Sequence, residues 1–178
     1  MKKLPALLVL AACAGGGPGS PAPGARQETP RPDELARAAE DVVGFLRGQV
    51  AFDRIRLADT VVLYVAPEGG GARAALPRER LRDPAGWTVR SGGSGTAYSF
   101  APPAGATELT TRPGRHLNCM EHPLASRFAE LARLPHVGTR LQPPGAASCL
   151  QSWNLTLVFD PDLRPPTLVA VVHDRWEW

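Results

Sequence analysis

The segment from Arg115 to His122, RHLNCMEH, concentrates two histidines, a cysteine and a glutamate in eight residues. His116, Glu121 and His122 offer nitrogen and oxygen ligands of the kind that zinc takes, and Cys119 adds a sulfur. The spacing contains neither a CxxC pair nor an HExxH pattern, which are common in zinc sites. Alternatively, Cys119 is a reactive thiol, with His116, His122 or Asp174 as its base and orienting group, or it is half of a disulfide.

The N-terminal thirteen residues, MKKLPALLVLAAC, combine a basic pair, an apolar run and small residues in front of Cys13. This is the layout of an export signal, and the apolar run is too short to cross a bilayer as a permanent helix. Leu10-Ala11-Ala12-Cys13 resembles the lipobox of bacterial lipoproteins, in which the cysteine is acylated and becomes the first residue of the mature chain. An ordinary secretory signal, cut near Ala14, is the alternative.

The resemblance implies that residues 1–12 are a signal peptide and that palmitate-type acyl chains on Cys13 anchor the protein to a membrane. Ala14 and Gly15 follow Cys13, in place of the Asp that signals inner-membrane retention in many Gram-negative lipoproteins. In a Gram-negative cell, we therefore expect the periplasmic face of the outer membrane.

Assigning Cys13 to the lipid leaves two cysteines, Cys119 and Cys149. An even number of cysteines in an exported chain predicts a disulfide, because disulfides persist in oxidising compartments. A bonded Cys119 has no thiolate to offer, so His116, Glu121 and His122 remain as the weaker metal candidates. We expect no metal, cofactor or catalytic residue.

Both lysines of the chain, Lys2 and Lys3, lie in the predicted signal peptide. The remainder carries 18 arginines against 17 acidic residues, so its net charge is near +1. The arginines are scattered and form no basic block, which argues against a nucleic-acid partner.

Residues 13–32 are rich in Gly and Pro and are expected to form a flexible tether for a single domain at residues 33–178. Apolar residues recur at helical spacing from Asp33 to Gly48 and again in PLASRFAELARL, residues 123–134. Residues 135–147 resemble a Pro/Gly loop. Strands are expected at residues 59–66, 73–76, 88–90, 96–100, 106–111, 148–159 and 167–178. This order predicts an α+β fold, with two helices packed on a curved antiparallel sheet.

Trp153, Trp176 and Trp178 are candidate binding residues, because tryptophan buries a large area and brings one hydrogen-bond donor. Packing within the core is the alternative. The sequence thus predicts a lipid-anchored cell-envelope protein that binds an envelope protein or a small apolar ligand without catalysis. The alternative function is a metal-assisted hydrolase that uses His116, Glu121 and His122.

Overall fold

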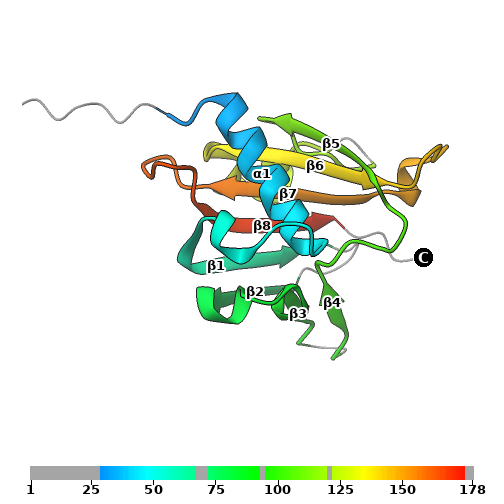
Figure 1. The fold of residues 1–178 in the computed structure, drawn as a ribbon, viewed down its shortest axis with the longest axis horizontal. Helices are drawn as coiled ribbons and strands as arrows, with labels where there is room; N and C mark the ends of the chain where they lie inside the picture. The colour runs from blue at the N-terminus through cyan, green and yellow to red at the C-terminus, as the bar shows by residue number, and fades with distance from the viewer. Residues whose placement is uncertain (1–28, 67–71, 93–94, 120–121, 175–178) are drawn as a thin grey trace, which may run out of the picture.

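The computed structural model describes residues 29–66, 72–92, 95–119 and 122–174. Within these residues one α-helix, α1 (Pro32–Leu46), lies across a six-stranded sheet, and a two-stranded sheet adjoins one side (Figure 1). The strands are β1 (Leu57–Val65), β2 (Ala72–Pro77), β3 (Thr88–Arg90), β4 (Ala97–Ser99), β5 (Glu108–Pro113), β6 (His136–Gln142), β7 (Trp153–Phe159) and β8 (Leu168–Asp174). No described helix is long and apolar enough to cross a membrane.

The predicted first helix is confirmed as α1. Its buried side chains recur at helical spacing and face the sheet. At its start the backbone N–H of Arg31 donates to the Glu34 carboxylate over 3.1 Å, and Pro32 occupies a first-turn position that needs no N–H. Gly48, with φ of 71°, lies just past its end in the left-handed conformation that glycine tolerates.

The large sheet has the order β2-β1-β8-β7-β6-β5. Each pair of neighbours along the chain is antiparallel: β1 with β2, β5 with β6, β6 with β7, and β7 with β8. The last strand then pairs with the first, because β8 lies parallel to β1. A hairpin near the start of the domain and a four-stranded meander at its end are therefore joined by one parallel pair.

The expected fold class, with two helices on a curved antiparallel sheet, is wrong in two respects. The sheet is mixed, because β1 and β8 run parallel. The expected second helix at residues 123–134 consists instead of two short 3-10 turns, η4 (Leu124–Ser126) and η5 (Leu131–Arg133). A segment of this length is marginal as a helix in isolation, and the Ser126 hydroxyl donates locally to the Pro123 carbonyl over 2.7 Å.

Strand β6 was expected to be part of a Pro/Gly loop, and the structure corrects this. Its residues Val137, Thr139 and Leu141 alternate inward and are fully buried. Gly138 points to the other side, where a Cβ would lie 2.5 Å from the Arg115 carbonyl oxygen. The glycine that suggested a loop is thus required by the close approach of another backbone.

The two faces of the large sheet are covered differently. On the helix face, α1 and the β3–β4 hairpin pack over the larger apolar cluster, which includes Val43, Leu63 and Leu157. On the opposite face, residues 115–119 and 122–135 pack over a smaller cluster that includes Leu124, Leu131 and Val172. We call this second side the disulfide face, because Cys119 lies within the segment that covers it.

Candidate functional site

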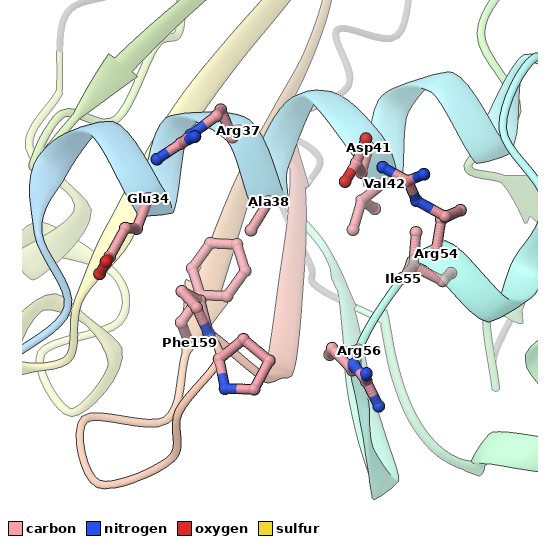
Figure 2. A pocket seen from close by; sticks show the side chains of 11 residues that line it. Glu34, Arg37, Ala38, Asp41, Val42, Arg54, Ile55, Arg56 and Phe159 are labelled. Atoms are coloured by element: carbon pink, nitrogen blue, oxygen red, sulfur yellow. The ribbon is translucent and has the colours of Figure 1, made fainter.

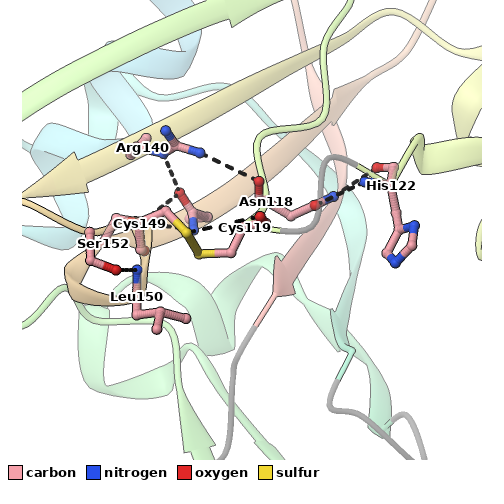
Figure 3. Close-up of a disulfide and its surroundings, with 9 residues drawn as sticks. Asn118, Cys119, His122, Arg140, Cys149, Leu150 and Ser152 are labelled. Atoms are coloured by element: carbon pink, nitrogen blue, oxygen red, sulfur yellow. Dashed lines mark hydrogen bonds between the residues drawn. A yellow bond between two sulfur atoms is a disulfide. The ribbon is translucent and has the colours of Figure 1, made fainter.

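Cys119 and Cys149 lie at disulfide distance, with their Cα atoms 5.5 Å apart, as the sequence predicts (Figure 3). The Asn118 side chain closes the turn that carries Cys119, donating to the His122 carbonyl over 2.7 Å and accepting from the His122 N–H over 3.1 Å. Cys149 begins the 3-10 turn η6 (Cys149–Gln151), directly before β7. The disulfide therefore ties the segment on the disulfide face to the start of a central strand.

His116 lies in a buried hydrogen-bonded group on the same face. Its Nε2 is 2.8 Å from Asp174 Oδ2, and the two side chains are only 5% and 10% exposed. Its Nδ1 is 2.6 Å from the Thr156 hydroxyl. A carboxylate only accepts, so Nε2 donates to Asp174, and in the neutral ring Nδ1 accepts from Thr156. The three side chains connect residue 116 to β7 and β8.

A hydroxyl, an imidazole and a carboxylate in contact also form the catalytic group of many hydrolases. Here Thr156 is 1% exposed. The hollow beside His116 and Asp174 encloses about 10 Å³, which is room for about one water molecule. Because no substrate carbonyl can reach the hydroxyl, the arrangement supports the fold and does not provide a nucleophile.

The metal candidates do not converge in the described structure. Both ring nitrogens of His116 are hydrogen-bonded, so neither offers a lone pair to a metal. His122 is exposed, and Glu121 lies outside the described residues. Among the residues that are described, no group of three His, Cys, Asp or Glu side chains is placed to hold a metal ion.

Of the candidate tryptophans, Trp153 is described and is 5% exposed on the helix face. Its ring centroid is 5.9 Å from that of His173, and its Nε1 finds no hydrogen-bond partner in the described structure. Trp153 is therefore a packing residue. Trp176 and Trp178 lie outside the described residues.

A groove that sequence reasoning missed lies between α1 and the ends of the strands, with a volume of about 280 Å³ (Figure 2). Its floor is apolar: Val42 and Ile55 are each 2% exposed, and Phe159 is 1% exposed. Pro165 and Pro166 form one wall, and their rings restrict the backbone there. We call this hollow the α1 groove. Its lining residues come from two parts of the chain, residues 34–56 and 159–166, which are more than 100 positions apart, so no local sequence pattern predicts it.

Charged side chains ring the α1 groove, and several are paired with one another. The Glu34 carboxylate forms ion pairs with Arg31 at 2.9 Å and with Arg164 at 3.2 Å. The hydrogen bond from the Arg31 side chain holds the pKa of Glu34 below its ordinary value of 4.5. Arg37 lies 3.1 Å from Asp33. Within the described structure, Arg54 and Arg56 make no side-chain hydrogen bond or ion pair, and their guanidinium groups remain available to a ligand.

A second hollow, of about 520 Å³, lies at the start of α1, lined in part by Pro32, Pro113 and Pro135. Thr29, the first described residue, lies on its rim. Because the described residues begin on the rim of this hollow, we take the α1 groove, whose lining lies within the described domain, as the candidate ligand site.

Comparisons with protein families, with curated proteins and with solved structures find no match for this chain. Thr156, which contacts His116, is a second feature, besides the α1 groove, that the sequence patterns did not single out. The available signal was its position in β7, where it places a polar group on the face opposite Leu155 and Leu157.

Proposed function

We propose that this protein is a cell-envelope binding module, anchored to the membrane through an acylated Cys13, with the α1 groove as its ligand site. The lipobox-like residues Leu10-Ala11-Ala12-Cys13 support the anchor. The pairing of Cys119 with Cys149 fits an oxidising compartment. With a tether that leads from Cys13 to the start of α1, the domain stands on the order of 25 Å from the bilayer.

The observation that carries the binding function is the composition of the α1 groove. Small-molecule sites are concave and mostly apolar, with a few polar groups that orient the ligand. The α1 groove has this arrangement, with a floor of Val42, Ile55 and Phe159 beneath a charged rim. In the His- and Cys-containing segment, by contrast, the side chains of His116 and Asn118 are engaged in hydrogen bonds within the domain.

The anchor is tested by growing bacteria that express the full chain with an alkyne analogue of palmitate, followed by coupling to a fluorophore and membrane fractionation. We expect label and membrane association for the native chain and for the matched control Cys119→Ser/Cys149→Ser. Cys13→Ala should lose the label. Label that persists on Cys13→Ala, or a native chain that takes up none, contradicts the proposal.

A further inference from the structure

The rim of the α1 groove has a charge preference once its internal pairs are set aside. Glu34 is held between Arg31 and Arg164, and Arg37 is paired with Asp33. The groups that remain on the groove are Asp41, Arg54 and Arg56, which together carry one net positive charge. A ligand that enters the groove therefore meets more unpaired positive than negative charge.

The two unpaired arginines are placed around the apolar floor. Figure 2 shows Ala38 and Val42 pointing from α1 into the groove, Ala38 toward Phe159, with Arg54 and Arg56 on either side of Ile55. An apolar group that rests on Ile55 and Phe159 consequently has one end beside the two arginines that flank Ile55. Asp41 lies near Arg54 in the same view and limits how much negative charge the rim accepts.

We infer that the α1 groove binds a small ligand that carries one carboxylate on an apolar body, an inference that rests on the proposed binding function. The planar guanidinium of arginine matches a carboxylate through two parallel hydrogen bonds. A single negative charge suits the rim better than a doubly charged phosphate, because Asp41 repels the second charge. The volume of about 280 Å³ lies just below the usual range for ligand sites, which begins at about 300 Å³, so the ligand is small.

The test compares two probes of nearly the same shape, 4-phenylbutyrate and its neutral amide, 4-phenylbutyramide. Each is titrated by calorimetry into the full chain in phosphatidylcholine nanodiscs, and empty nanodiscs give the blank for partitioning. We expect the carboxylate to bind roughly tenfold or more tightly than the amide, which is what the loss of charge-assisted hydrogen bonds implies.

Variants test whether Arg54 and Arg56 cause the preference for the carboxylate over the amide. In Arg54→Gln/Arg56→Gln we expect the two probes to bind equally, because the charges that select the carboxylate are gone. Arg73→Gln/Arg90→Gln removes two exposed arginines that do not line the groove, and it should keep the preference. Circular dichroism of each variant confirms that it is folded.

The outcomes separate the inference from the proposed function. Equal binding of both probes to the native chain overturns the carboxylate assignment and leaves the groove as a ligand site. Tighter binding of 3-phenylpropyl phosphate than of 4-phenylbutyrate overturns it in favour of a phosphate ligand. Binding of neither probe overturns the inference and removes the groove as the site, while acylation of Cys13 still stands or falls by its own test.

Discussion

The helix face and the disulfide face of the same sheet are stabilised in different ways. On the helix face, α1 covers a continuous apolar cluster that extends from Leu35 to Val171. On the disulfide face, an irregular segment covers a much smaller cluster and is fixed by hydrogen bonds of His116 and Asn118 and by the Cys119–Cys149 disulfide.

The difference follows from the covering elements. A helix satisfies its own backbone and can offer one apolar side to a sheet. An irregular segment leaves backbone groups to be satisfied by side chains or by the strands beneath it. His116 and Cys119, the residues that suggest chemistry in the sequence, are therefore explained by their structural role. They hold an irregular segment against the sheet where no helix covers it.

The largest expected effect is a cavity in the core of the helix face. Leu157→Ala, at a fully buried position in β7, should lower the free energy of unfolding by about 2–5 kcal/mol, measured by chemical denaturation. Leu124→Ala on the disulfide face is the matched change and should cost less, because the irregular segment around it can collapse into the space. Equal costs would remove the proposed difference between the faces.

The disulfide is expected to contribute next. The cysteines are separated by 30 residues, and a loop of that length implies about 3–4 kcal/mol on the chain-entropy model. Cys119→Ser/Cys149→Ser should lose this amount in denaturant unfolding, and a reductant should destabilise the native chain but not the variant. A native chain whose stability is unchanged by full reduction would show that the apolar contacts hold the segment alone.

Gly138→Ala tests the close approach of the segment to β6. The new Cβ would lie 2.5 Å from the Arg115 carbonyl oxygen and 2.9 Å from the Leu117 nitrogen, so we expect a loss of about 1–3 kcal/mol from overpacking. Gly92→Ala is the control, because its added Cβ meets no atom of the described residues within 4 Å. If thermal melts give the two variants the same melting temperature, the segment does not cross β6 this closely.

The buried hydrogen bonds can be compared across the faces by two threonine substitutions. Thr156→Val leaves His116 Nδ1 without its partner, which should cost about 1–3 kcal/mol. Thr139→Val on the helix face removes a 3.1 Å bond to the Leu155 carbonyl. That carbonyl belongs to a sheet strand and keeps its other lone pair for a further partner, so we expect a smaller loss of stability than for Thr156→Val. The reverse order of the two melting temperatures would argue against a stabilising role for the His116 group.

The smallest expected effect concerns the surface at the start of α1. The Arg31 hydrogen bond lowers the pKa of Glu34, so Glu34 favours folding above its ordinary pKa of 4.5, and this contribution disappears as the pH falls through the lowered value. Glu34→Gln should therefore be slightly less stable than the native chain at pH 7 and no different in strong acid. Calorimetric melts from pH 7 to strong acid measure the difference in stability between the native chain and Glu34→Gln. A difference that stays constant at every pH would show that it does not come from the lowered pKa of Glu34.

The sequence predicted those parts of the fold that depend on short-range patterns. α1 follows from its apolar spacing, and the β1–β2 and β3–β4 hairpins follow from β-branched runs separated by glycines. The parallel pairing of β1 with β8 was not predictable in this way, because it joins residues more than 100 positions apart. Turn-forming residues in a sequence indicate pairing only between strands that follow one another along the chain.

The errors at residues 123–142 have two physical causes. The stripe of Leu124, Phe128, Leu131 and Leu134 does pack against the sheet, but burial requires only that these side chains face it, not that the backbone be helical. Gly138 likewise suggested a loop where it permits a close contact. The α1 groove and the His116 group form only when distant elements meet, so the sequence showed their residues without their arrangement.

The most direct test is hydrogen exchange, followed by mass spectrometry on the full chain with and without reductant. It asks whether the disulfide holds the segment on the disulfide face independently of α1. Our account predicts that reduction speeds exchange in residues 115–119 and 122–135 while α1 stays protected, and that Cys119→Ser/Cys149→Ser behaves like the reduced native chain. Equal acceleration in α1 and in the segment, or no acceleration in either, would contradict it.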